Sequence, residues 1–282
     1  MAYVTLKTLF KSCTGRNAIG AFNVHNIEFI KGVVAAAERT GKPTIMMINE
    51  AVLLYSSIEI LAGAAVAAAQ KASVDMAVMV DHGTHIDFLK ECLDYGIDIM
   101  YDGSALPYEE NIANTHMLAD YAHARGLSIE GEIGVLGISE DGDVESEQCM
   151  TTVPQALDFS SRTDVDVLAV SVGNSHGFYM GEAKINVDRI REISTAVTPL
   201  PVVMHGGSDI PYKTIRNSIL AGIKKFNIAT DLKQAYAVKM NELMTQDPLP
   251  IQPLKIFPAA AEAVAAVAEQ KIRDFNLERD AR

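Results

Sequence analysis

Three of the seven histidines in this 282-residue chain follow short apolar runs and stand next to glycine. They are His82 in DHG, His176 in SHG and His205 in HGG. A catalytic metal site needs three protein ligands and one open position, and three imidazoles meet that need for Zn2+. One such histidine alone is more often a hydrogen-bonded loop residue, but three in the same setting favour a divalent metal site.

Other polar residues follow apolar runs in the same way, and most carry a carboxylate or an amide. They are Asn23, Asn49, Asp81, Asp102, Glu130, Glu132, Asn227 and Thr230. The stretch 130–148 combines many carboxylates with several glycines, which predicts a mobile loop over the site, although a solvated acidic loop is the simpler interpretation. Glu140 on this stretch is the candidate for a base that acts once substrate is bound.

These side chains need a scaffold that brings the ends of many strands together. Short apolar or β-branched runs alternate about eight times with segments whose apolar residues recur at helical spacing. The predicted strands are 18–23, 44–49, 75–81, 97–102, 128–132, 167–172, 201–204 and 224–228. The predicted helices are 28–40, 58–71, 86–94, 111–125, 153–161, 187–196, 210–220 and 231–244.

This alternation predicts a parallel sheet of α/β type. Eight units without a Gly/Pro/Ser-rich linker favour one closed (β/α)8 TIM barrel over two doubly wound domains. We therefore expect residues 1–282 to form a single barrel domain, with an extra C-terminal helix at 259–274 and residues 245–282 as a C-terminal extension. Such barrels carry their active sites at the carboxyl ends of the strands, where the polar residues above are expected.

The composition argues against several classes of function. A net charge of -12 and a pI near 5.0 oppose binding to nucleic acid or to an anionic membrane surface. The three cysteines are scattered and form no CxxC pair, which favours a reducing compartment over a disulfide framework. The first residues lack the apolar run of a signal peptide, and no stretch approaches the ~20 apolar residues of a membrane span, so we expect a cytoplasmic protein.

Seven motifs carry a resemblance to a known family. In chain order they are GAFNVHN (20–26), VDHGTH (80–85), DGSALPYEENI (102–112), EGEIGVLG (130–137), VGNSHGFY (172–179), VMHGGSD (203–209) and FNIATDLK (226–233). In order and spacing the chain resembles the class II, zinc-dependent ketose-bisphosphate aldolases, and most of all their tagatose-bisphosphate and fructose-bisphosphate branch. The resemblance implies a TIM barrel lyase of carbohydrate metabolism and glycolysis.

The resemblance also implies the metal ligands. His82, His176 and His205 would bind one Zn2+ per subunit, and Asp102 and Glu132 match secondary carboxylates that lie near the ion. In the family a monovalent cation, Na+ or K+, often binds near the substrate phosphate.

Two residues match the family's catalytic groups. Asp81 matches the acid/base that moves the proton of the C4 hydroxyl, and Glu140 matches the loop carboxylate that moves the proton at the carbon nucleophile. The residues implied to contact the substrate are Asn23, Asn49, Gly177, Gly206, Gly207, Ser208, Asn227, Ile228, Ala229 and Thr230.

The implied reaction is the reversible cleavage of a ketose 1-phosphate or 1,6-bisphosphate to dihydroxyacetone phosphate and an aldehyde. This reaction passes through an enediolate, whose negative charge a metal ion stabilises as a Lewis acid. A Schiff-base aldolase is the weaker interpretation, because no lysine follows a predicted strand in apolar surroundings, and Lys224 opens the eighth strand at the opposite face.

The sequence departs from the family pattern at the far end of the substrate. Met47 and Asn49 stand where the family usually has a glutamine or other polar residue and a serine. The arginine that pairs with the second phosphate is missing, since none lies between Arg216 and Arg273, and Lys255 is the candidate substitute. Ala229 is a weak sign of the tagatose-type pattern. The far end of the aldehyde is therefore left open.

Two other functions stay as alternatives. A non-catalytic barrel subunit that assists an aldolase would have lost ligands or base, whereas the histidines, Asp81 and Glu140 are present. A metal-dependent hydrolase would use the ion to activate water, but such barrels usually carry HxH on the first strand. The expected partner is a small phosphorylated sugar, and the family resemblance implies a homodimer or homotetramer.

Overall fold

Eight almost fully buried runs form one closed parallel barrel in the computed structural model, which describes residues 3–134, 137–138, 150–179, 181, 183–246 and 251–281. The barrel strands are β1 (Ile19–Asn23), β2 (Thr44–Asn49), β3 (Met76–Gly83), β4 (Asp98–Tyr101), β5 (Ile129–Ile133), β7 (Val167–Val170), β9 (Val202–Met204) and β10 (Ile223–Ile228). They close in the order β1-β10-β9-β7-β5-β4-β3-β2. The predicted (β/α)8 barrel is confirmed, and no predicted strand end differs from the observed one by more than two residues.

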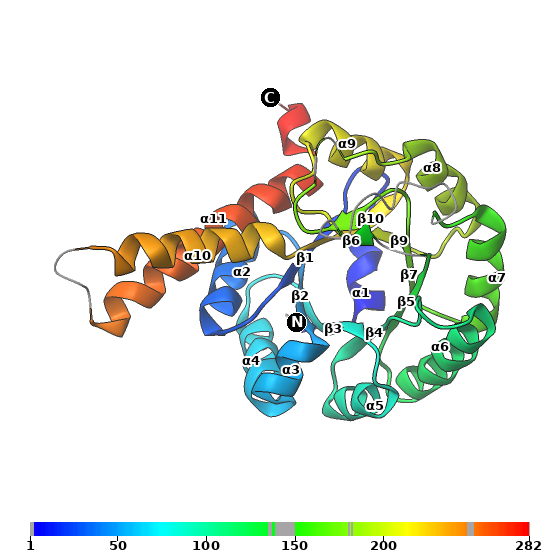
Figure 1. Cartoon of the computed structure of the whole chain (residues 1–282), viewed down its shortest axis with the longest axis horizontal. Helices are drawn as coiled ribbons and strands as arrows, with labels where there is room; N and C mark the ends of the chain where they lie inside the picture. The colour runs from blue at the N-terminus through cyan, green and yellow to red at the C-terminus, as the bar shows by residue number, and fades with distance from the viewer. Residues whose placement is uncertain are drawn as a thin grey trace.

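Most of the helices surround this barrel, and the short α1 lies within the ring of strands (Figure 1). The α-helices are α1 (Leu6–Leu9), α2 (Ile27–Thr40), α3 (Glu50–Ser56), α4 (Gly63–Lys71), α5 (Ile86–Tyr95), α6 (Tyr108–His123), α7 (Val153–Thr163), α8 (Val187–Ala196), α9 (Tyr212–Ala221), α10 (Thr230–Met244) and α11 (Pro253–Phe275). The shorter turns are η1 (Phe10–Ser12), the π-helical η2 (Ile58–Ala62) and η4 (Glu278–Ala281). Two further short strands, β6 (Gly137–Ile138) and β8 (Ser175–His176), pair with each other outside the barrel.

The alternation of side chains along each strand explains what fills the barrel. Ala21, Met47 and Met79 belong to an inner cluster of buried apolar side chains, and alternate strand residues such as Phe22 and Met46 belong to the outer cluster beneath the helices. Two residues further along the same strands, the next positions on the inward face are polar. They are Asn23, Asn49 and Asp81. The strand period therefore places amides and carboxylates in the top layer of the barrel.

The amino end of the barrel is closed by a segment that the sequence patterns did not predict. In Figure 1, α1 lies within the ring of strands, and Leu6, Leu9 and Phe10 pack against the inner apolar cluster. A helix of four residues is too short to show a periodicity. This segment leaves the carboxyl end as the open end of the barrel.

The carboxyl-terminal helix is longer than predicted. It begins at Pro253 rather than at residue 259, because Pro253 occupies the first turn, where a missing N–H is tolerated, and Pro258 is accommodated inside the helix. Figure 1 shows α10 and α11 side by side as an arm that projects from the barrel, and α11 also packs along α2.

Among the described residues no single helix is long and apolar enough to cross a bilayer, and 50–56 with 58–71 reach that length and composition only as a pair bent by 101°.

Candidate metal centre and substrate cleft

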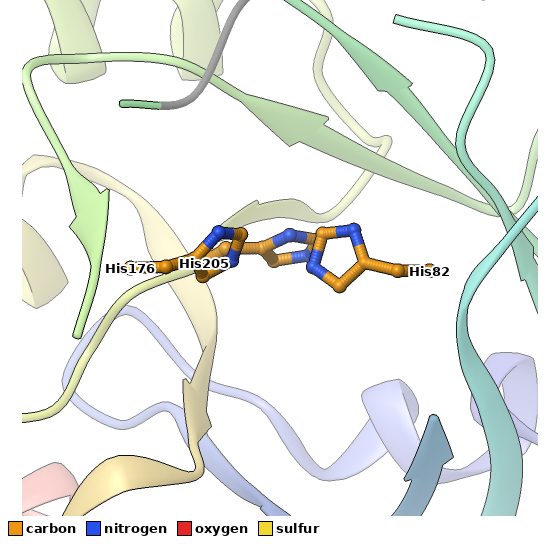
Figure 2. A group of neighbouring side chains, drawn as sticks. All are labelled: His82, His176 and His205. Atoms are coloured by element: carbon orange, nitrogen blue, oxygen red, sulfur yellow. The ribbon is translucent and has the colours of Figure 1, made fainter. Parts of the chain in front are cut away.

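Three imidazole rings converge at the carboxyl end of the barrel (Figure 2). His82 comes from β3, His176 from β8, and His205 directly follows β9. The ring of His82 lies 4.9 Å from that of His176 and 4.8 Å from that of His205, measured between centroids, and the latter two are 6.3 Å apart. One nitrogen from each ring lies within 4.8 Å of the others, so a single ion between the rings can reach all three.

The glycine beside His205 has a steric reason. Gly206 has a φ of 61°, and a Cβ at this position would lie 2.0 Å from the backbone oxygen of Ser175. Only glycine allows the chain after β9 to pass this close to β8, which carries His176. The HGG motif therefore brings two of the three histidines together.

Two buried polar atoms beside the rings have no hydrogen-bond partner among the described residues. They are Glu132 Oε2 and His205 Nδ1, which lie 3.7 Å apart. His82 Nδ1 is 3.5 Å from the same Glu132 oxygen and 2.8 Å from Asp102 Oδ2. Because an unpartnered buried acceptor is costly, this arrangement fits a cation that contacts the imidazoles and can also meet Glu132 and Asp102.

The three histidines differ in the direction in which their pKa values are shifted. Burial and the positive charge of His82 lower the pKa of His176 to about 4. Burial also lowers the pKa of His205. Although burial acts the same way on His82, the negative charges of Asp81, Glu132 and Asp102 raise its pKa to about 10. Two imidazoles are thus neutral with free lone pairs, and a cation must displace a proton from the third.

A buried ion pair orients His205, and the sequence patterns missed it. Glu130 Oε1 lies 2.8 Å from His205 Nε2, and Glu130 Oε2 accepts a 2.6 Å hydrogen bond from Lys225 Nζ. Burial raises the pKa of Glu130, but the positive charge of Lys225 and the hydrogen bond with His205 outweigh this and lower it. The carboxylate therefore holds the Nε2 proton, which leaves His205 Nδ1 to face the centre.

Asp81 lies beside the rings and is held by two amides. Asn23 Nδ2 donates to Oδ2 at 2.7 Å, and Asn227 Nδ2 donates to Oδ1 at 3.1 Å. Burial would raise the pKa of Asp81, but the positive charge of His82 and the hydrogen bond from Asn23 lower it. Both asparagines were predicted as substrate contacts, and the structure gives them a second task, which is to fix an ionised carboxylate.

A cleft of about 600 Å³ opens above these residues. It is lined by Asn23, His25, Asn49, Val52, Asp81, His82, Asp102, His176, Gly177, Gly206, Ser208, Asn227, Ala229, Thr230 and Lys233. Two predicted contacts are not among the lining residues, since Ile228 is buried in the outer core and Gly207 donates its N–H to the Asn227 carbonyl. Glu140 lies outside the described residues.

The cleft also contains residues that the motifs did not single out as contacts. Lys233 is in the fourth position of α10, His25 follows β1, and Val52 lies on α3. Lys255, the predicted substitute for the missing arginine, is exposed on α11 and is not among the lining residues.

Comparison with known proteins assigns the family. Residues 4–279 match the model of the family described as fructose-bisphosphate aldolase class-II. A sulfofructosephosphate aldolase of Alkalicoccus urumqiensis is 34% identical over 100% of this chain and 99% of its own length. A fructose-bisphosphate aldolase of Geobacillus stearothermophilus is 32% identical over 98% of both chains.

A solved structure agrees with this assignment. The crystal structure of the YdjI aldolase from Escherichia coli K12 is 32% identical, has a TM-score of 0.87 and covers 99% of this chain and 100% of that one. The family expected from the seven motifs is therefore confirmed, and with it an aldolase of the lyase class. The chain belongs to the class II fructose-bisphosphate aldolase family.

Proposed function

We propose that this chain is a zinc-dependent aldolase that reversibly cleaves a ketose 1-phosphate or ketose 1,6-bisphosphate, of fructose or tagatose type, to dihydroxyacetone phosphate and an aldehyde. The observation that carries the proposal is the convergence of three histidines on unpartnered buried acceptors, beside a carboxylate clamped by two amides. Of these groups, Asp81, its two amide partners, His82 and His176 line one cleft.

His82, His176 and His205 hold the zinc ion, with Asp102 and Glu132 as the secondary carboxylates. When bound, the ion supplies Lewis-acid stabilisation of the negative charge of the enediolate, a contribution of several kcal/mol. The Glu130–Lys225 pair fixes the tautomer of His205 that presents Nδ1. His82 must lose its proton before it can act as a ligand.

Asp81 moves the proton of the C4 hydroxyl. Its carboxylate is ionised, and Asn23 and Asn227 each donate to one of its oxygens, so the side chain cannot rotate away from the cleft. A positioned proton transfer of this kind contributes about 10^2 to 10^4 in rate. We assign the proton transfer at the carbon nucleophile to Glu140.

The phosphate of dihydroxyacetone phosphate is expected where β9 and β10 end. Gly206, Ser208 and Thr230 line that part of the cleft, and Thr230 is the first residue of α10. The free N–H groups and the dipole of a helix N-terminus favour an anion. Gly177, Asn227 and Ala229 complete the lining on this side, and a monovalent cation, Na+ or K+, remains a prediction for the same place.

The names of two relatives indicate two kinds of group on the substrate carbon furthest from the C1 phosphate. The name fructose-bisphosphate aldolase indicates a second phosphate, and the name sulfofructosephosphate aldolase indicates a sulfo group. Both are tetrahedral oxyanions, so the proposed substrate carries an anion at each end or, at the minimum, at C1.

We further propose a homodimer or homotetramer in the cytoplasm. The arm of α10 and α11 exposes apolar side chains to solvent, namely Val238, Met244, Ile251, Leu254 and Phe257. Such a patch is typical of a protein interface, and light scattering after gel filtration measures the assembly. A reducing compartment agrees with the free thiols of Cys13 and Cys92.

The test of the function is chelator-sensitive release of dihydroxyacetone phosphate, measured by a coupled assay. Fructose 1,6-bisphosphate, tagatose 1,6-bisphosphate and fructose 1-phosphate are supplied to protein as purified, after chelation, and after chelation and added Zn2+. We expect activity that chelation abolishes and zinc restores. If zinc-loaded protein cleaves no ketose phosphate, including a 6-sulfo analogue, the proposed function is wrong.

A further inference from the structure

His82 points in a direction that a regular β-strand would not give it. Along β3, Met79 belongs to the inner apolar cluster and Val80 to the outer one. Alternation would therefore place the side chain of Asp81 inside the barrel and that of His82 outside it. The His82 ring nevertheless meets the other two imidazoles at the mouth of the barrel, and Asp81 lines the same cleft (Figure 2). Two consecutive residues of one strand thus face one site.

A bulge in β3 explains this departure. In the pairing of β3 with β4, Val80 opposes Ile99. Gly83 opposes Tyr101, so β3 contains one more residue than β4 between the two pairs. His82 lies within this bulge and has a φ of 49°, in a region that residues other than glycine rarely adopt. Such a conformation persists only where the surrounding structure holds it.

A buried carboxylate holds the backbone that follows the bulge. Because β2 lies beside β3, the start of α3 stands next to this turn, and Glu50 is the first residue of α3. Glu50 Oε2 accepts hydrogen bonds from the N–H and the hydroxyl of Thr84 at 3.1 and 3.0 Å and lies 2.9 Å from His85 Nδ1. Glu50 Oε1 accepts from the N–H of His85 at 3.0 Å. One side chain therefore fixes the two residues that follow the bulge.

The charge of Glu50 strengthens this hold. Burial would raise its pKa, but the hydrogen bonds from His85 and Thr84 lower it, so the carboxylate is ionised. Hydrogen bonds to an ionised acceptor are stronger than those to a neutral one. On the other side, Asp102 Oδ2 lies 2.8 Å from His82 Nδ1. Asp102 thus orients the ring of His82, and Glu50 holds the backbone that carries it.

We propose that Glu50 is a positioning residue: by holding the turn after the bulge, it keeps His82 directed at the metal site beside Asp81. The inference rests on the proposed aldolase function, in which the ion and the Asp81 carboxylate act on the same substrate. Glu50 is not among the lining residues of the cleft. Its loss should therefore alter metal binding and the chemical step more than the binding of the sugar.

The experiment compares Glu50→Gln with the wild type in three measurements. The amide keeps the size of the side chain but loses the charge and one acceptor. The Kd for Zn2+, from competition with a chromophoric chelator, should rise about 10-fold to 100-fold, as for other residues that orient metal ligands. The visible spectrum of Co2+ bound in place of zinc should change, because it depends on ligand geometry. For the best ketose phosphate, kcat should fall about 10-fold or more while KM stays within about threefold.

Matched variants separate positioning from stability. Glu59→Gln, at an exposed position on η2, should behave as the wild type. Thr84→Val removes only the hydroxyl bond to Glu50 and should raise the Kd for Zn2+ about threefold to tenfold, and it decides the question if Glu50→Gln does not fold.

The proposal is overturned if the folded variants are only less stable in urea, while zinc affinity, the cobalt spectrum and kcat match those of Glu59→Gln. Glu50 would then have a merely structural role, and the aldolase function would be unaffected. A wild type that binds zinc but cleaves no sugar would refute the aldolase function instead. Zinc affinity and the cobalt spectrum would still decide whether Glu50 positions His82.

Discussion

At the amino end of the barrel the buried carboxylate of Asp98 bonds within the chain, whereas at the carboxyl end several buried polar atoms have no partner among the described residues. Asp98 at the start of β4 accepts the N–H of Leu6 at 2.6 Å and the N–H of Ser128 at 2.8 Å. The buried atoms without a partner among the described residues are His25 Nε2, Glu132 Oε2, His205 Nδ1, Asn227 Oδ1 and, on α9, Ser218 Oγ.

Four of these five atoms belong to residues at the carboxyl end. A native fold tolerates few such groups, and where they gather a ligand is the usual explanation. The two ends thus use the same kinds of residue for different purposes. At the amino end the carboxylate of Asp98 bonds to backbone amides and holds the closing segment, and at the carboxyl end Glu132 keeps one oxygen available to an ion.

The largest effect is expected from removing a metal ligand at the carboxyl end. His82→Ala should lower kcat/KM on the order of 10^3-fold or more, because the Lewis-acid contribution of several kcal/mol is lost. Zinc content by elemental analysis should fall with it. His116→Ala, at an exposed position on α6, is the control. If His82→Ala still binds zinc and cleaves substrate, these rings are not the metal centre.

The next largest effect is expected at the buried Glu130–Lys225 ion pair in the barrel interior. Lys225→Met leaves the Glu130 carboxylate without its cation, which should lower the free energy of unfolding by about 3–5 kcal/mol in urea titrations of metal-free protein. Adding Glu130→Gln should restore much of it, since no uncompensated charge then remains. Equal stability of Lys225→Met and wild type would mean that the pair does not hold the interior together.

At the closed end, stability and activity should separate. Asp98→Ala removes the acceptor for two backbone N–H groups and should cost about 2–4 kcal/mol of unfolding free energy. Zinc content and kcat/KM at a temperature where the variant is folded should stay within about twofold of the wild type. A selective loss of activity in the folded variant would contradict the division between the two ends.

Local sequence patterns predicted the fold and several residues of the candidate site. The strand–helix alternation predicted the barrel, and polar residues directly after apolar runs predicted His82, Asp81 and Asp102 at the rim. This succeeded because parallel strands place their carboxyl ends at one face, whatever the exact register. Local pattern and topology are sufficient for that step.

The sequence did not predict the features that depend on strand register or on contacts between segments far apart in the chain. Lys225 lies inside a predicted strand, and only its inward orientation and its pairing with Glu130 across the barrel make it buried. The closing segment at Leu6 packs through contacts with strands far along the chain. Lys233 becomes part of the cleft because β10 closes against β1, a pairing of the first and last strands that no local pattern contains.

The smallest effect tests the closed end through its titration. Burial raises the pKa of Asp98 to about 7, above an unfolded value near 3.8, so the folded state binds the proton more tightly. The stability from this group is therefore fully present below about pH 4 and is lost as pH rises through 7. Between pH 5 and 7 the wild type should lose about 2 kcal/mol relative to Asp98→Asn, which has no such proton. Urea titrations of both metal-free proteins at each pH measure the difference. A constant difference would mean that Asp98 stays ionised, with its bonds to Leu6 and Ser128 strong enough to outweigh burial, and that the closed end, like the open one, contains a permanent charge.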